Sequence, residues 1–175
     1  IASAGIMNCN GGTTTGNVVA SGATAPYTGD GNHTVSAGSH SFTVTDANGC
    51  TAIASVTVME PSAIIPSASS TAILCTGGTA TISVSATSGV EPYSGIGEFI
   101  VGAGTYSYTV TDASGCTAST SITVTEPSAV IASSVSTPIM CTGGSSSVSV
   151  SATGGTAPYS GTGDFNVTAG TYSYT

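Results

Sequence analysis

Apolar and polar residues alternate through long stretches of this chain. In the middle of the sequence, Ile82, Val84 and Ala86 alternate with Ser and Thr, and the segments 106–110 and 116–124 alternate in the same way. A period of two is typical of a strand with one buried face. No stretch shows the helical period or a helix cap. The pattern therefore predicts an all-β protein.

Two short segments predict tight turns between these strands. "DASG" at 112–115 separates two alternating runs, and it combines a turn-forming Asp with a Gly that can adopt positive φ. We expect a hairpin there. "SGVEPY" at 88–93 predicts a second turn.

The whole pattern returns without a gap, and the positions of its successive copies differ by 66. "TVTDANGC" at 43–50 comes back as "TVTDASGC" at 109–116, and "APYTG", "EPYSG" and "APYSG" follow one another in the same register. A fixed period of this size predicts a tandem array. If Glu-Pro closes each unit, the domains are residues 1–60, 61–126 and 127–175, and only the second is complete. We expect the chain to be a window of a longer array. The alternative is that another molecule supplies the missing strand of the third unit.

Each unit is expected to be a small immunoglobulin-like sandwich. Six or seven short antiparallel strands in a repeat of this length suit such an architecture, so the predicted fold class is all-β with tandem immunoglobulin-like β-sandwiches. Small domains bury a smaller share of their surface than large ones. A covalent cross-link would therefore help to stabilise each unit.

The cysteines are the candidates for that cross-link. The sequence numbers of Cys9 and Cys50 differ by 41, as do those of Cys75 and Cys116, and each pair lies at or near the starts of two strands. We predict the disulfides Cys9–Cys50 and Cys75–Cys116, each contributing about 4 kcal/mol in the chain-entropy model, with Cys141 unpaired in this fragment. Zinc is the rival use, but two thiols per unit without a recurring His do not complete a four-ligand site. Disulfides imply an oxidising, extracytoplasmic setting.

The charge of the chain argues against two classes of partner. It contains no Lys or Arg and eight Asp and Glu, giving a formal net charge of −8. Neutralising phosphates requires clustered cations, so we expect no nucleic-acid partner. No apolar run approaches the roughly 18 residues that span a bilayer, so we expect no membrane insertion in this segment.

Candidate catalytic residues are scarce. His33 and His40 occur only in the first unit, where the register places Phe and Tyr in the other two units. We interpret both histidines as occupants of aromatic positions, with a metal-binding or catalytic role as the alternative. The sequence predicts no enzyme activity and no cofactor.

Two weaker sets of binding candidates recur with the period. Asp46 and Asp112 begin the predicted hairpin turns, where carboxylates could bind calcium or accept hydrogen bonds from their own backbone. The only recurring aromatic residues that suggest a glycan contact follow each Pro, and their alternative role is packing in the core or a turn. They are Tyr27, Tyr93 and Tyr159.

The order of motifs resembles a known family. "CTGG", a Ser/Val strand, "EPY", "AGTYSYTVTDASGC", a Thr/Val strand and "TEP" are similar to the SprB-type repeats of giant bacterial cell-surface adhesins. The resemblance covers the middle unit and the visible parts of the other two. It implies a very long, secreted cell-surface protein with tandem immunoglobulin-like modules. After "PY" that family usually continues through a strand bearing Trp, whereas this chain has the short "SGIGEFIVG" and no Trp.

The function expected from the sequence is structural and adhesive. We expect an extracellular, cell-surface fibre, stalk or filament whose partners are neighbouring repeats and identical chains, with a surface polysaccharide as a further partner. The alternative is a calcium- or glycan-binding adhesin module, and an enzyme is a third class.

Overall fold

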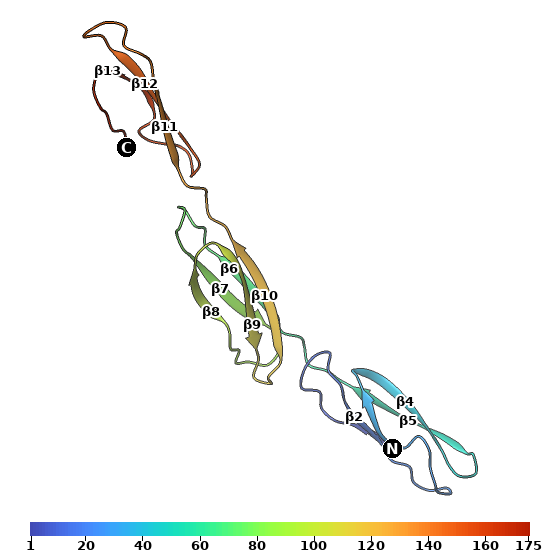
Figure 1. Ribbon diagram of the computed structural model, residues 1–175. Coiled ribbons are helices and arrows are strands. Elements are labelled where there is room, and N and C mark those ends of the chain that lie inside the picture. The colour runs from blue at the N-terminus through green and yellow to red at the C-terminus, as the bar shows by residue number, and fades with distance from the viewer. The chain divides into compact units, whose positions relative to one another are not determined.

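The computed structural model describes all residues from 1 to 175 and contains strands and turns but no helix (Figure 1). The predicted all-β class is confirmed. No helix that could cross a membrane is present. The strands of the first repeat are β1 (Ala2–Ala4), β2 (Thr14–Val18), β3 (Gly31–Val35), β4 (Gly38–Thr45) and β5 (Thr51–Val58).

The later strands follow the sequence period. These strands are β6 (Ile65–Ser70), β7 (Ala80–Thr87), β8 (Gly97–Val101), β9 (Gly104–Thr111), β10 (Thr117–Val124), β11 (Ile131–Ser136), β12 (Ser146–Thr153) and β13 (Gly163–Val167). The four strands from β7 to β10 begin one period after the four strands from β2 to β5. In the same way, β12 begins one period after β7, and β13 one period after β8.

The strands form small sheets of two kinds. Three-stranded sheets have the orders β1-β2-β3, β6-β7-β8 and β11-β12-β13, and two-stranded sheets pair β4 with β5 and β9 with β10. The second repeat thus contains five strands, fewer than the six or seven expected. Residues 88–96, which include the turn predicted at 88–93, form no strand and pair with β9 only through the isolated bridge between Ser94 and Thr111.

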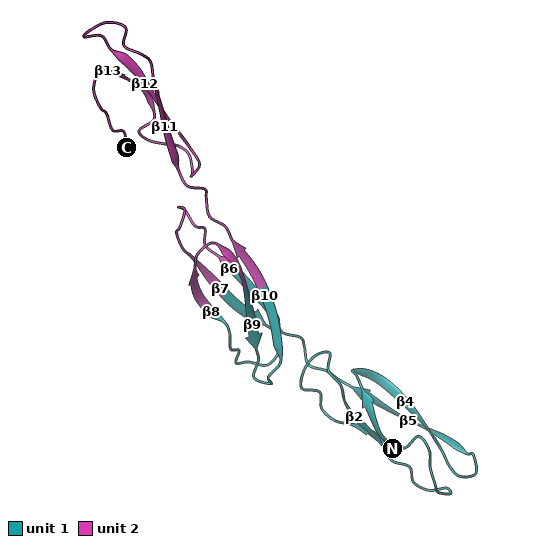
Figure 2. Cartoon of the chain, viewed as in Figure 1, with its two compact units in different colours: residues 1–68, 84–97, 107–120 teal, residues 69–83, 98–106, 121–175 magenta.

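The chain divides into two compact units, shown in Figure 2. Unit 1 comprises residues 1–68, 84–97 and 107–120, and unit 2 comprises residues 69–83, 98–106 and 121–175. Unit 1 therefore contains the whole of the first sequence repeat together with part of the second. The boundaries suggested by Glu-Pro fall between β5 and β6 and between β10 and β11.

The core of the first repeat lies between its two sheets. Met7, Val35 and Val58 are buried together, at 5%, 4% and 4% exposure. Val35 ends β3 in the three-stranded sheet, and Val58 ends β5 in the two-stranded sheet. Burying each such side chain contributes about 1.5–3 kcal/mol. This arrangement of two antiparallel sheets around one apolar layer is that of a small β-sandwich.

The predicted alternation is confirmed in the second repeat. In β7, Ile82 and Val84 are buried, while Ser83 and Ser85 are exposed. Side chains on successive strand residues point to opposite faces, so one face of β7 joins the core and the other meets solvent.

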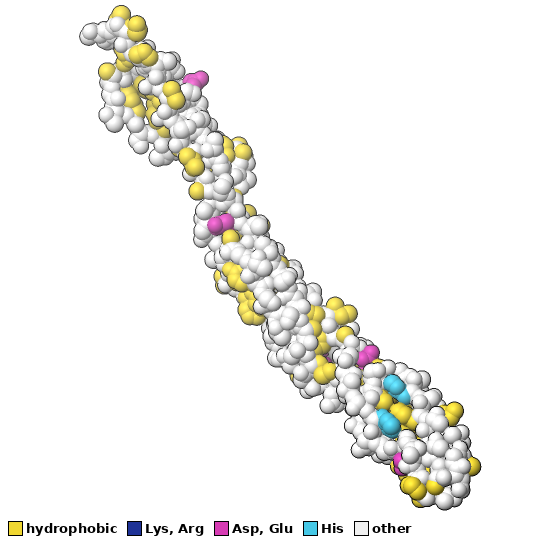
Figure 3. Space-filling view, turned by 45° about the vertical axis from the view of Figure 1, so that its right-hand side comes forward, with side chains coloured by type: hydrophobic (Ala, Val, Ile, Leu, Met, Phe, Trp, Pro, Cys, Tyr) yellow, Lys and Arg dark blue, Asp and Glu magenta, His cyan; other side chains and the backbone are white.

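Exposed hydroxyl groups of neighbouring strands form hydrogen-bonded pairs. Ser41 and Ser55 join β4 to β5 with a 3.0 Å hydrogen bond, and Ser133 and Ser151 join β11 to β12 at 2.8 Å. Such cross-strand pairs contribute roughly 0.2–1 kcal/mol each. The surface view accordingly shows few acidic side chains and no Lys or Arg (Figure 3).

Candidate functional site

A turn containing the first cysteine of the repeat follows β1. The Gly12 N–H donates a 3.4 Å hydrogen bond to the carbonyl oxygen of Cys9, and Gly11 has a φ of 71°. A positive φ at the third position is typical of a type II turn and favours glycine. The later repeats have the same bond, from Gly78 to Cys75 and from Gly144 to Cys141, both at 3.0 Å.

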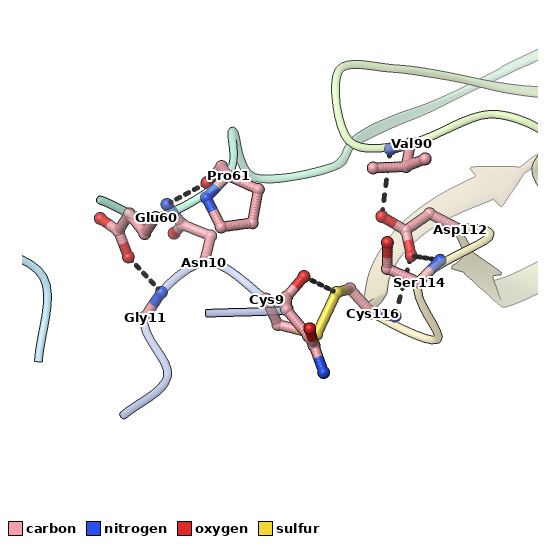
Figure 4. Close-up of a disulfide and its surroundings, with 10 residues drawn as sticks. Cys9, Asn10, Gly11, Glu60, Pro61, Val90, Asp112, Ser114 and Cys116 are labelled. Atoms are coloured by element: carbon pink, nitrogen blue, oxygen red, sulfur yellow. Dashed lines mark hydrogen bonds between the residues drawn. A yellow bond between two sulfur atoms is a disulfide. The ribbon is translucent and has the colours of Figure 1, made fainter. Parts of the chain in front are cut away.

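The Glu-Pro motif holds this turn in place. The Gly11 N–H donates a 2.6 Å hydrogen bond to Oε2 of Glu60, and Nδ2 of Asn10 donates to the carbonyl oxygen of Pro61 at 3.1 Å. Figure 4 shows both contacts. The cysteine turn is therefore attached to the segment that leads into the next repeat. The sequence pattern indicates only that Glu-Pro marks the boundary of a unit and does not predict this contact.

The second repeat has the same contacts. The Gly77 N–H donates to Oε2 of Glu126 at 2.6 Å, and the hydroxyl of Thr76 donates to the carbonyl oxygen of Pro127 at 2.7 Å. All four residues belong to unit 2. The same local structure thus occurs at both Glu-Pro motifs.

The other cysteine lies at the hairpin between β9 and β10. The Gly115 N–H donates to the Asp112 carbonyl oxygen at 3.0 Å, and Gly115 has a φ of 82°. Oδ1 of Asp112 accepts hydrogen bonds from the N–H groups of Ser114 and Cys116, each at 2.9 Å. The predicted hairpin is confirmed, and its Asp carboxylate fixes the backbone of the cysteine.

These hydrogen bonds set the acidity of Asp112. Burial raises the pKa of this carboxyl. Hydrogen bonds from backbone N–H groups outweigh burial and hold the pKa below its ordinary value of 3.8; the donors are Cys116, Val90, Ser114 and Gly115. Hydrogen bonds to a carboxylate favour its ionised form. Asp112 is only 7% exposed. Because little solvent reaches the carboxylate, its charge is stabilised mainly by the backbone N–H groups that donate to it.

Asp46 has the same role in the hairpin between β4 and β5. The Cys50 N–H, which donates to Oδ1 at 2.8 Å, lowers the pKa of Asp46 most; burial opposes this, and the N–H groups of Thr24 and Asn48 lower the pKa further. Both calcium candidates, Asp46 and Asp112, therefore direct their oxygens at backbone donors. No three His, Cys, Asp or Glu side chains come together as a metal site.

One disulfide is present, and it joins Cys9 to Cys116 with a Cα–Cα distance of 5.5 Å (Figure 4). Both residues belong to unit 1. The bond crosses the Glu-Pro boundary between the first and second repeats. Cys50, Cys75 and Cys141 are free and exposed. The predicted pairs Cys9–Cys50 and Cys75–Cys116 are therefore wrong.

The length of β5 explains why Cys9 does not pair with Cys50. The Cys9 turn is attached to Glu60, just beyond the end of β5, whereas Cys50 directly precedes the start of β5. β5 has 8 residues and so extends over roughly 26 Å. A disulfide requires Cα atoms within about 7 Å of each other. The equal spacing of the two predicted pairs reflected the period and not proximity.

A shallow groove surrounds the disulfide. It is lined by Cys9 and Asn10, by residues 62–64 after the Glu-Pro motif, and by residues 115–118 of the hairpin. These three segments belong to unit 1. The end of one repeat, the connecting segment and the hairpin of the next repeat thus come together at the bond.

The three tyrosines proposed as glycan contacts have internal partners. The hydroxyl of Tyr93 donates a 2.6 Å hydrogen bond to the Ser88 carbonyl oxygen, and Tyr27 and Tyr159 donate to the carbonyl oxygens of Gly22 and Gly154. Each tyrosine is half-buried and follows a cis Pro. This geometry supports the alternative role of turn packing.

The histidines occupy aromatic positions, as the register predicted. Nε2 of His40 lies 2.9 Å from the Ser36 carbonyl oxygen. In the corresponding place, the hydroxyl of Tyr106 donates to the Gly102 carbonyl oxygen at 3.2 Å. His33 lies with its ring centroid 4.6 Å from that of Phe42. The equivalent rings of the third repeat, Phe165 and Tyr174, are also 4.6 Å apart.

Comparison with known proteins places the chain in no family: no protein-family model matches it, and no curated protein matches it.

Proposed function

We propose that this chain is part of an extracellular structural and adhesive protein, built from tandem immunoglobulin-like sandwiches, that forms a surface fibre, stalk or filament and has no catalytic activity. The observation that carries the proposal is the covalent bond between Cys9 and Cys116. It joins two consecutive sequence repeats at the boundary where Glu60 and Pro61 also make hydrogen bonds.

Repeats that are joined mainly to their sequence neighbours form a quasi-one-dimensional array. Such an array grows in length as repeats are added. The disulfide also supports an oxidising compartment, because cytosolic thiols are kept reduced. Both points favour a secreted, mechanical role, and the motif resemblance to SprB-type adhesin repeats points in the same direction.

The surface favours association between identical chains. Three-stranded sheets such as β6-β7-β8 have strands at both edges, and unpaired edges are sites for pairing with further chains. The chain has no Lys, the residue that commonly protects such edges. The edge strands β6 and β11 contain no charged residue, whereas β8 and β13 carry the exposed carboxylates of Glu98 and Asp164. Lateral contact between chains would therefore use β6 and β11.

The calcium- and glycan-binding alternative has less support. Asp46 and Asp112 accept hydrogen bonds from backbone N–H groups, and the recurring tyrosines donate to nearby carbonyl oxygens. A ligand would have to compete with these internal contacts.

Electron microscopy of the natural protein tests the proposal. We expect thin fibres with a regular axial repeat of one small sandwich, whereas compact particles would contradict it. Calorimetric titration of the chain with calcium tests the alternative. We expect no saturable heat; a saturable heat that disappears in the double variant Asp46→Asn, Asp112→Asn would favour the calcium-binding module.

A further inference from the structure

The cysteines of this chain fall into two structural classes. The turn class comprises Cys9, Cys75 and Cys141, which precede a Gly-Gly pair. The hairpin class comprises Cys50 and Cys116, which follow Asp-x-x-Gly. The one disulfide joins a member of each class, and its sequence separation is 107. Because this separation exceeds the period, the bond passes from one repeat into the next.

We propose that the same bond forms at every junction of the array, so that each turn cysteine is bonded to the hairpin cysteine of the following repeat. This proposal rests on the proposed tandem array. It gives a disulfide partner to each of the three thiols that are free in this chain, Cys50, Cys75 and Cys141. Cys75 is the turn half of the next junction and pairs with a cysteine at position 182. Cys50 is the hairpin half of the preceding junction.

The turn class has the same geometry in every copy. The bond that closes the turn is present at Cys9, Cys75 and Cys141. The attachment of the turn to the Glu-Pro motif has the same 2.6 Å length at Glu60 and at Glu126. Cys75 is therefore held beside the second Glu-Pro motif as Cys9 is held beside the first. The thiol is presented at the start of the next repeat.

The hairpin class is equally constant. The Cys50 N–H donates to Oδ1 of Asp46 at 2.8 Å, and the Cys116 N–H donates to Oδ1 of Asp112 at 2.9 Å. Only Cys116 is bonded. Local structure thus prepares both cysteines in the same way, and what distinguishes them is the presence of a preceding turn cysteine at the right distance along the chain.

The pattern of bonded and free cysteines follows from this rule. At the sequence separation of the observed bond, 107, a partner for Cys50 would precede position 1, and partners for Cys75 and Cys141 would lie at positions 182 and 248. All three positions are outside the chain. The rule therefore gives one bond and three free thiols, as observed. Pairing within each repeat would have given two bonds.

An exposed apolar residue marks each unoccupied turn. At the bonded junction, the residue before the turn cysteine is Asn8, and its carbonyl oxygen lies 3.1 Å from Sγ of Cys116. The equivalent residues at the other two turns are Leu74 and Met140, which are 80% and 87% exposed. Asn8 makes this contact through its backbone and is itself exposed, so a hairpin bonded to Cys75 or Cys141 would contact the backbone of Leu74 or Met140 in the same way.

Bond formation requires an external oxidant, and a low-molecular-weight disulfide such as oxidised glutathione suffices. The turn thiolate attacks that disulfide, forms a mixed disulfide and releases one glutathione thiolate. The hairpin thiolate then attacks the protein sulfur of the mixed disulfide and releases the second. Two protein thiols are oxidised to one disulfide, one glutathione disulfide is reduced to two thiols, and the two protons pass from the protein thiols to the released glutathione.

Interlaced bonds of this kind would limit how far the array can be extended when its repeats unfold. The loop closed by Cys9–Cys116 overlaps the loop that Cys75 would close with position 182. Every residue of a repeat within the array would therefore lie inside at least one disulfide loop. A covalent path passes from Cys9 to Cys116, along the backbone to Cys141, and across the next bond. Unfolding two repeats would then extend this path to at most about 90 Å, against roughly 450 Å for two repeats without cross-links.

A slightly longer chain tests the proposal directly. It consists of residues 1–175 followed by a copy of residues 110–126, which supplies the hairpin of the third repeat and its cysteine at position 182. The chain is refolded in a glutathione redox buffer, its remaining thiols are alkylated, and it is digested with a protease that cuts before Asp. Trypsin has no site, because the chain has no Lys or Arg.

The digestion distinguishes a bond between neighbouring repeats from a bond within one repeat. We expect peptide 46–111, which contains Cys50 and Cys75, to be linked to the new C-terminal peptide, and peptide 1–29 to be linked to peptide 112–163, which contains Cys116 and Cys141. Two thiols per chain remain free. A link between Cys141 and position 182 would overturn the proposal.

Two variants of the longer chain identify the cysteines of the new bond. Cys75→Ser should leave position 182 alkylated, while the matched control Cys50→Ser should leave both bonds intact. A bond to position 182 that survives Cys75→Ser would also overturn the proposal. The fibres expected by microscopy do not depend on this result, so the two proposals fail separately.

Discussion

The backbone N–H of Gly11 donates a 2.6 Å hydrogen bond to Oε2 of Glu60. The two residues are 49 positions apart, and the contact recurs between Gly77 and Glu126 with the same separation and length. The carboxylate at the end of one repeat thus fixes the turn that carries half of the junction disulfide. Hydrogen bonds to an ionised acceptor are stronger than those between neutral groups.

Replacing that carboxylate should weaken the junction. We expect Glu60→Gln to lower the free energy of unfolding of the reduced chain by about 1 kcal/mol, because the amide keeps the shape but loses the charge. Urea unfolding followed by circular dichroism measures the change. The matched control is Glu98→Gln, at an exposed position on β8, for which we expect no change. Equal effects of the two substitutions would contradict the role assigned to Glu60.

Loss of the disulfide should have a large effect. The bond has a sequence separation of 107, and for a loop of that size the chain-entropy model gives about 4.7 kcal/mol. We expect Cys9→Ser and Cys116→Ser to destabilise the oxidised chain by this order of magnitude, and the double variant to be no less stable than either. Cys75→Ser is the control, since Cys75 is free in this chain, and it should leave the unfolding midpoint unchanged. A similar loss in all three single variants would argue against the bond.

Stability should fall in acid because of the two hairpin carboxylates. The pKa values of Asp46 and Asp112 are lowered from 3.8 in the folded chain. Their contribution to stability is therefore complete above about pH 4 and is lost as pH falls through the lowered pKa values. The double variant Asp46→Asn, Asp112→Asn should have a lower melting temperature at pH 7 and a weaker dependence on pH between 4 and 2.

The control for that prediction uses carboxylates outside the hairpins. Asp30 and Asp164 are exposed, so Asp30→Asn together with Asp164→Asn should keep the acid dependence of the wild-type chain. Thermal unfolding followed by circular dichroism at a series of pH values gives both curves. A variant lacking Asp46 and Asp112 that retains the full acid dependence would show that other groups cause it.

Three glycines should respond to alanine in a graded way. Gly95 has a φ of 81°, and a Cβ there would overlap the carbonyl oxygen of Thr109. Gly77 has a φ of 75°, but a Cβ would meet nothing within 4 Å. Gly102 has neither constraint. We expect Gly95→Ala to prevent native packing or to cost more than about 2 kcal/mol, Gly77→Ala to cost about 1–2 kcal/mol, and Gly102→Ala to stay within about 0.5 kcal/mol. Urea unfolding of the three variants measures these differences, and equal losses at Gly95 and Gly102 would contradict the tight approach to Thr109.

Local features of the fold could be predicted from the sequence because their causes are local. The alternation around Ile82 and Val84 follows from the period of a half-buried strand, and the hairpin at Asp112 follows from the turn chemistry of Asp and Gly. The substitution of His40 for the tyrosine of later repeats was visible from the register alone. In each case a few adjacent residues determine the structure.

The disulfide could not be found in the same way. Cys9 and Cys116 meet because the end of one repeat lies against the hairpin of the next, and the position of that junction depends on strand lengths and on the Glu60 contact. Cysteines of the same repeat are as regularly spaced along the sequence as cysteines on the two sides of a junction. The period therefore does not distinguish pairing within a repeat from pairing across a junction. The signal that could have done so is the length of strand β5, which separates Cys50 from the turn of Cys9.

The central claim, that the covalent bond of this chain lies at the junction between repeats, is tested most directly by a disulfide map of the chain. The oxidised chain is alkylated, unfolded and digested before its four Asp residues, which gives peptides 1–29, 30–45, 46–111, 112–163 and 164–175. We predict that peptide 1–29 is linked to peptide 112–163, in which Cys141 carries the alkyl group, and that peptide 46–111 is recovered alone with two alkylated cysteines. Linkage of peptide 46–111 to peptide 1–29 or to peptide 112–163 would contradict the account.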